Sequence, residues 1–198
     1  NLTTGTNSSK NFAGASGSIN ILVAPTVTLG LAGSPLAEAG GVATVTATLS
    51  AVSTLPVTVE LGFSGTATNS DDYVRSGAQI VIAAGSSSGS ITLTAVQDAL
   101  DETDETIIVD ITGVTNGTES GTQQATTSIV DDDPPPMVTL AVNNATIPED
   151  AGVATITAIL SAPSGLPVTV DLGFTGTATL TDDYTRSGTQ IVITPGNT

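Results

Sequence analysis

The stretch Val42-Ala-Thr-Val-Thr-Ala-Thr-Leu49 decides the fold of this chain, because apolar and threonine residues alternate from Ala43 to its end. Successive side chains of a β-strand point to opposite faces. The apolar residues from Ala43 to Leu49 therefore share one face, and the threonines share the other. This period of two predicts a strand that is buried on one side only, as in an antiparallel sheet.

Six further stretches have a similar strand-like character and are separated by loop residues. They are residues 27–31, 57–63, 79–83, 90–95, 106–113 and 123–130. No segment shows helical periodicity. Asn116-Gly117 is a strong hairpin signal between the last two stretches, because both central residues of a type I′ turn need positive φ. Seven short strands in about 110 residues predict an all-β, immunoglobulin-like seven-strand β-sandwich.

The chain repeats itself. Val27-Thr-Leu29 returns as Val138-Thr-Leu140, and Phe63 returns as Phe174, in each case 111 residues later (138 minus 27, 174 minus 63). Residues 27–87 and 138–198 align without a gap at about 60% identity, which predicts tandem modules of one kind. We expect a complete repeat over 25–133, a proline linker over 134–136, and the N-terminal part of a second repeat over 137–198.

Residues 1–24 resemble the closing strand of the complete repeat, so we expect the terminal strand or strands of a preceding repeat there. The end of this segment, Val23-Ala-Pro25, lacks the aspartates that precede Pro134, so the joint ahead of the complete repeat should bind a cation weakly or not at all. Two interpretations of the chain ends stay open. The chain is a section of a longer array, or one subunit's N-terminal segment completes its neighbour's sandwich in a homo-oligomer or filament.

Composition excludes several classes of function. Of 198 residues, 19 are acidic and 3 are basic, and the net charge of −16 disfavours binding to nucleic acid and to anionic membranes. Cysteine and histidine are absent, so neither a disulfide nor a zinc site can form, and any metal must be bound by oxygen. The sequence contains no run of about 18 apolar residues, so it does not predict a segment that inserts into a membrane.

The stretch Ile129-Val-Asp-Asp-Asp-Pro-Pro-Pro-Met-Val138 has the composition of a joint between two modules. Each proline fixes its own φ, so Pro134 to Pro136 form a short, stiff spacer. Three adjacent aspartates repel one another. We interpret Asp131, Asp132 and Asp133 as ligands of a cation that is held where the two modules meet.

Most other acidic residues of the complete repeat also lie between predicted strands. Glu38 precedes the second strand, Asp71 and Asp72 follow the third, and residues 98–105 contain an acidic run before the sixth. In a seven-strand antiparallel sandwich these loops lie at the same pole as the end of the last strand. Calcium takes about 6–8 oxygen ligands, whereas magnesium demands a tighter octahedron. A calcium site is the leading hypothesis, and acidic loops that only maintain solubility are the alternative.

With these motifs in this order, the chain resembles the Calx-beta repeat. The matching stretches are 65–73, 91–105 and 129–133, and the resemblance covers 26–133 completely and 137–198 as a partial copy. It implies a β-sandwich that binds Ca²⁺. The implied metal ligands are Glu38, Asp72, Asp98, Glu102, Glu105, Asp131, Asp132 and Asp133, with Glu149 and Asp183 retained in the second copy. Ala39 and Gln97 replace possible acidic ligands, so we expect fewer ions or weaker binding.

The function that these observations favour is a non-catalytic, calcium-binding structural repeat of an extracellular or cell-surface fibre or adhesin. Calcium would stiffen the joint between neighbouring repeats. A regulatory calcium sensor and a metal-free spacer stay open as alternatives. Paired carboxylates can hydrolyse glycosides, but with 3% aromatic residues and no tryptophan the chain has little to stack on a sugar, so we do not expect an enzyme.

Overall fold

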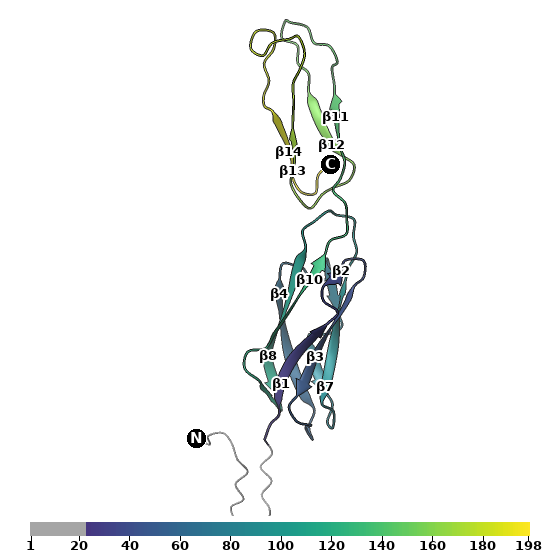
Figure 1. Cartoon of the computed structure of the whole chain (residues 1–198), viewed down its shortest axis with the longest axis vertical. Coiled ribbons are helices and arrows are strands. Elements are labelled where there is room, and N and C mark those ends of the chain that lie inside the picture. Colours follow the sequence, from purple (N-terminus) through teal and green to yellow (C-terminus); the bar gives the residue numbers. More distant parts are fainter. Residues whose placement is uncertain (1–22) are drawn as a thin grey trace, which may run out of the picture.

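The computed structural model describes residues 23–198, which form strands and loops (Figure 1). The terminal strand expected within residues 1–24 lies outside the described residues, apart from its last two positions. None of the described residues belongs to a helix long and apolar enough to cross a membrane.

The first repeat folds into two five-stranded sheets, with the orders β5-β7-β3-β1-β9 and β2-β10-β8-β4-β6. The strands are β1 (Thr26–Ala32), β2 (Leu36–Ala37), β3 (Val42–Leu49), β4 (Val57–Gly65), β5 (Tyr73–Arg75), β6 (Gln79–Ile82), β7 (Ser88–Ala95), β8 (Glu105–Thr115), β9 (Thr118–Glu119) and β10 (Gln124–Val130). The predicted all-β sandwich is confirmed. The seven longest strands correspond to the seven predicted ones, and β2, β5 and β9 are too short to produce a recognisable period.

Burial follows the alternation that predicted β3. Ala43, Val45 and Ala47 are fully buried, and the intervening threonines are not. The same face of β7 contributes Ile91 and Leu93, while strands of the opposite sheet contribute apolar residues such as Val59, Ile107 and Val109 to the same core. Such burial of apolar area is the main stabilising term for a domain of this size. The core thereby fixes the strand ends from which the acidic loops emerge.

The turn at Asn116-Gly117 differs from the predicted two-residue hairpin. Asn116 has positive φ (61°), but Gly117 is not among the residues with positive φ. The next residues form β9, which pairs with β1 of the other sheet, before β10 returns to pair with β8. The Asn116 amide donates to the carbonyl of Pro56 (2.9 Å), so the asparagine fastens the turn to a neighbouring loop.

The second repeat contains four strands at positions equivalent to β1, β3, β4 and β6. These are β11 (Val138–Val142), which pairs with β12 (Ile156–Leu160), and β13 (Val168–Asp171), which pairs with β14 (Gln190–Ile193). Its buried core is small, consisting of Ala158, Leu160 and Ile193. Val138 is 40% exposed, whereas its equivalent Val27 is fully buried. Among the described residues, no strand equivalent to β7, β8 or β10 covers this face.

Residues 131–137 connect the two repeats without forming a strand. Figure 1 shows the second repeat following the first along the long axis of the molecule, beyond the end of β10. The connection therefore begins at the pole of the first repeat where β10 ends. This is the pole to which the sequence assigned the acidic loops.

Candidate metal centre

Six acidic side chains line one pocket at this pole of the first repeat. They come from four separate connections: Glu38 follows β2, Asp72 precedes β5, Asp98, Glu102 and Glu105 lie in or directly after the β7–β8 loop, and Asp131 follows β10. Val96, Thr103 and Ile129 complete the lining. The structure thus brings together six of the eight ligands expected in this repeat.

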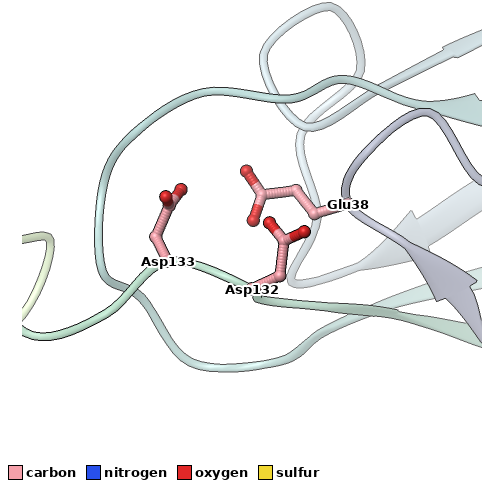
Figure 2. A group of neighbouring side chains, drawn as sticks. All are labelled: Glu38, Asp132 and Asp133. Atoms are coloured by element: carbon pink, nitrogen blue, oxygen red, sulfur yellow. The ribbon is translucent and has the colours of Figure 1, made fainter.

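The remaining two expected ligands, Asp132 and Asp133, form a second group with Glu38. One carboxylate oxygen from each of the three residues lies within 4.8 Å of the others. Figure 2 shows the carboxylates of Glu38 and Asp132 close together, with Asp133 reaching toward the same space from the chain that leaves β10. Because Glu38 belongs to both groups, the pocket and this second group adjoin.

Backbone contacts hold Glu38 in place between two of the connections. Its side chain is 8% exposed, and its Oε1 accepts a hydrogen bond from the backbone N–H of Asp98 (3.1 Å). Its own backbone N–H donates to the carbonyl of Val130 at the end of β10 (3.1 Å). Glu38 therefore links the β7–β8 loop to the start of the inter-repeat connection.

Asp72 is positioned by a tight turn that starts at Thr68, shortly after β4 ends at Gly65. Gly65 has a φ of 124°, and a Cβ there would collide with the backbone of Thr106 on β8. Asp72 donates its backbone N–H to the carbonyl of Thr68 (3.0 Å), and its Oδ2 accepts from the Thr68 N–H. One oxygen of Asp72 thus serves the turn, and the residue lies beside Glu105 in the pocket.

The two ligands expected in the second repeat are not brought together with other acids. Asp183 repeats the turn of Asp72, with Oδ2 accepting from the Thr179 backbone N–H (2.7 Å) and hydroxyl (2.8 Å). These hydrogen bonds lower the pKa of Asp183. Glu149 is exposed. Within residues 23–198, no group of acids with a shared ligand geometry includes either residue.

Burial and neighbouring charges raise the pKa of three glutamates at the acidic pole. Burial, followed by a hydrogen bond and charge repulsion from Asp72, raises the pKa of Glu105 to about 7. Burial is also the largest cause that raises the pKa of Glu102, with repulsion from Asp98 next. For Glu38 the burial effect outweighs the backbone hydrogen bonds that oppose it. Burial and the neighbouring negative charges thus disfavour the charged forms of these three glutamates.

Asp131 provides the observation that tests whether a cation fits. Its Oδ1 is buried and has no hydrogen-bond partner, while its backbone N–H donates to Asp104 Oδ1 (3.3 Å). A buried carboxylate oxygen without a donor carries a desolvation cost that a coordinated cation would offset. All of the charged groups that could bind a metal here are carboxylates, which suit a hard cation such as calcium or magnesium. The residues present therefore fit an oxygen-liganded divalent cation.

Two further residues contribute to the site in ways that the sequence did not indicate. The Gln97 amide lies over the second group, with Nε2 3.2 Å from Asp132 Oδ1 and 3.4 Å from Asp133 Oδ2. The sequence identified Gln97 only as a lost ligand. Asp104 lies in the same acidic run as the expected ligands but holds the backbone of Asp131 instead. The only available signal was position, because Gln97 directly precedes the acidic run and Asp104 lies within it.

Comparison with known proteins identifies a family that matches the chain. The family model of the Calx-beta domain matches residues 25–133 and 131–198. No curated protein matches the chain. Similar solved structures include the apo-form Calx CBD1 domain (20% identity, 55% of this chain and 99% of that chain, TM-score 0.47). They also include CBD12 from CALX1.2 (15% identity, 67% and 68%, TM-score 0.48) and SSP-19 of Caenorhabditis elegans (13% identity, 49% and 94%, TM-score 0.31). Because the two matched segments together extend from residue 25 to residue 198, the chain belongs to the Calx-beta domain family.

Proposed function

We propose that the first repeat binds calcium at its acidic pole and has no catalytic role. The observation that carries the proposal is the single pocket lined by six carboxylates from four connections, in which Asp131 Oδ1 is buried without a hydrogen-bond donor. Calcium takes about 6–8 oxygen ligands in a flexible arrangement, which a pocket of carboxylates and backbone carbonyls can supply. Asp132 and Asp133 offer a second, adjoining position that shares Glu38.

Bound calcium would act on the joint between the repeats. Asp131, Asp132 and Asp133 connect β10 directly to the prolines of the linker. Without a cation, the repulsion among these side chains and Glu38 opposes a fixed path for the chain. With a cation, the same oxygens are drawn to one centre, and the first residues of the connection are fixed to the first repeat. Calcium thereby stiffens the joint.

The energetic scale suits a structural role. With free calcium at ten times the dissociation constant, one bound ion stabilises the folded state by about 1.4 kcal/mol. A structural role outside the cell requires only an affinity in the range of extracellular calcium modules, about 10⁻⁴ to 10⁻³ M, and we expect binding in this range. The tandem arrangement of the repeats supports a fibre or adhesin outside the cell or on its surface.

Calorimetric titration with calcium, and with magnesium as the competing ion, tests the proposal. We expect calcium to bind in the sub-millimolar to millimolar range, magnesium to bind more weakly, and calcium to raise the melting temperature of the chain relative to chelator. Absence of calcium binding would leave a metal-free spacer. A dissociation constant near or below about 10⁻⁶ M would favour a regulatory sensor instead.

The cellular location needs its own test. Intact cells that make the full-length protein can be treated with an added protease, with a cytoplasmic protein as the control. We expect the repeat to be cleaved while the control stays protected. Protection of the repeat until the cells are lysed would contradict an extracellular location.

A further inference from the structure

A serine turn of the second repeat contacts the acidic loop of the first. Asp101, in the β7–β8 loop, accepts a hydrogen bond at Oδ2 from the Ser164 hydroxyl (3.0 Å). The carbonyl of Asp101 accepts a second hydrogen bond from the backbone N–H of Gly165 (3.0 Å). Ser164 is 1% exposed, so the contact is closed to solvent. Asp101 lies next to Glu102, which lines the carboxylate pocket.

Gly165 permits this close approach. A Cβ at residue 165 would lie 2.6 Å from Oε1 and 2.7 Å from Cγ of Glu102. Any larger residue would therefore displace the Glu102 side chain or separate the two repeats. The absence of a side chain at residue 165 lets Glu102 stay in the pocket while Asp101 contacts the second repeat.

The first repeat contains the same turn at its opposite pole. Leu55 N–H donates to Ser53 Oγ (3.1 Å) as Leu166 N–H donates to Ser164 Oγ (3.1 Å). The Ser53 carbonyl also accepts from Gly85 (2.9 Å), as the Ser164 carbonyl accepts from Gly196 (2.9 Å). The turn therefore forms without a repeat docked on it among residues 23–198.

Its surroundings nevertheless differ between the two copies. Within residues 23–198, Ser53 is half-buried and Leu55 is 51% exposed, and both residues line a hollow together with Val52 and Pro25. Thr54 stands where the second repeat has Gly165. The nearly complete burial of Ser164 therefore results from the contact with Asp101, because the same turn at Ser53 leaves its serine only half-buried.

We propose that the serine turn is the docking element through which a repeat receives the acidic loop of its neighbour, and that the residue after the serine selects the loop. Glycine at this position accepts a loop with glutamate at the position of Glu102. Threonine, as in Thr54, excludes that glutamate and accepts an acidic loop of another repeat that has a smaller residue there. The turn at Ser53 is therefore a docking surface for a different repeat of the same kind.

The contact also gives the joint a direct connection to the acidic pole. The dependence of docking on calcium rests on the proposed function, because Glu102 and Asp101 are adjacent and a cation that holds Glu102 also fixes Asp101. The hydrogen bonds and the need for glycine do not rest on it. The two ideas can therefore fail separately.

Distance measurements between the two repeats test the docking. The chain has no cysteine, so Val81→Cys and Val192→Cys place one spin label on each repeat, at exposed and equivalent positions of β6 and β14. In this background we compare the full chain with Gly165→Thr, which inserts the residue of the first repeat. The matched control is Thr54→Gly, which makes the reverse exchange in the equivalent turn at Ser53 of the first repeat.

A second pair of variants keeps the test valid if Gly165→Thr disturbs the fold of the second repeat. Ser164→Ala removes the hydroxyl that contacts Asp101, and Ser53→Ala removes the same hydroxyl from the equivalent turn. Each lost hydrogen bond should lower the ratio of docked to undocked joints by about fivefold. We expect broadened inter-label distances for Gly165→Thr and Ser164→Ala, and unchanged distances for Thr54→Gly and Ser53→Ala.

Calcium titration of the same proteins separates the docking from the proposed function. Unchanged distance distributions in both Gly165→Thr and Ser164→Ala would overturn the docking element, whether or not calcium binds. Equal broadening by Ser53→Ala would overturn it as well, because that variant leaves the joint untouched. Broadening confined to the two joint variants, in a chain that binds no calcium, would support docking and refute the proposed function.

Discussion

Replacing Asp132 by asparagine should have opposite effects on stability and on calcium binding. One oxygen of Asp132 lies within 4.8 Å of a carboxylate oxygen of both Glu38 and Asp133. Two like charges at this distance repel by about 1 kcal/mol even with the screening of bulk water. Asparagine has a similar shape, and its Oδ1 can still accept the hydrogen bond that Gln97 donates. The substitution therefore removes charge with little other change.

In chelator and at low salt, Asp132→Asn should raise the free energy of unfolding of the first repeat by about 1–2 kcal/mol, since two repulsive pairs are removed. In calcium the variant loses an anionic ligand. Each tenfold loss of affinity lowers the calcium-dependent part of the stability by about 1.4 kcal/mol at saturating calcium. The calcium-induced gain should therefore be smaller in the variant than in the parent chain.

Urea unfolding followed by circular dichroism, in chelator and in calcium, measures both effects. Glu60→Gln is the matched control, because it removes the same charge from an exposed position on β4, away from the acidic pole. It should change neither the stability in chelator nor the calcium-induced gain by more than about 0.5 kcal/mol. Salt at about 1 M should abolish the advantage of Asp132→Asn, because the Debye length falls to about 3 Å. A variant that is no more stable than the parent in chelator would refute the idea that these carboxylates repel one another.

Three further predictions follow from the same geometry. Burial, followed by a hydrogen bond and charge repulsion from Asp72, raises the pKa of Glu105 from its usual value of 4.5 to about 7. The folded state therefore binds a proton more tightly than the unfolded state, and stability in chelator should fall by roughly 1–2 kcal/mol as the pH rises from about 4.5 to about 7. Thermal melts measure this loss, and a flat profile would contradict the raised pKa. Gln97→Asp places another carboxylate beside Asp132. Calorimetry should therefore show tighter calcium binding, and thermal melts in chelator should show a lower stability. An unchanged calcium affinity would show that residue 97 does not take part in the site. Gly65→Ala should lower the free energy of unfolding in urea by about 2–4 kcal/mol, because the new Cβ collides with β8. Gly40→Ala, whose Cβ would meet no atom within 4 Å, should lower it by only about 1 kcal/mol. Equal losses would show that the positive φ alone, and not the collision, sets the cost.

The strands were predictable because each long strand is buried on one face. Alternation along Val42–Leu49 specifies both the strand and the side that faces the core, and the repeated spacing of 111 residues extends the assignment to the second copy. The short strands β2 and β9 were not predictable. Each spans two residues and pairs in parallel at a sheet edge. Such pairing depends on the path of the chain in three dimensions, and a strand of two residues is too short to show a hydrophobic period that would reveal it.

The turn at Asn116 illustrates a conflict between local preference and tertiary contacts. The Asn-Gly sequence favours a two-residue hairpin. In the structure, Gly117 lies close to the carbonyl of Pro25, and the chain continues into β9 on the opposite sheet. Pairing β9 with β1 closes the edge of that sheet, which a direct hairpin between β8 and β10 would leave open. The tertiary contact therefore overrides the turn signal.

The candidate site was predictable as a region but not residue by residue. Antiparallel topology requires that the connections after β2, β4, β7 and β10 reach one pole, so convergence of their acids follows from the strand assignment. Within the β7–β8 loop, however, no fixed period relates sequence position to direction. Glu102 lines the pocket, its neighbour Asp101 contacts Ser164 of the second repeat, and Asp104 holds the backbone of Asp131. From the sequence, the acidic run could be interpreted only as one feature. In the structure its residues make three different kinds of contact.

This division gives the acidic run a physical reason beyond metal binding. A loop that only bound a cation would need oxygens that face the pocket, and the outward-facing Asp101 would add repulsion without benefit. The Asp101 carboxylate instead accepts a hydrogen bond from the uncharged Ser164 hydroxyl, which stabilises its charge at the joint. The backbone carbonyl of Asp101 accepts a second hydrogen bond from the Gly165 N–H. The peptide bond between Asp101 and Glu102 then joins the pocket to the contact between the repeats. A change in the position of Glu102 therefore reaches the next repeat by two routes, through that bond and through Gly165, which lies against the Glu102 side chain.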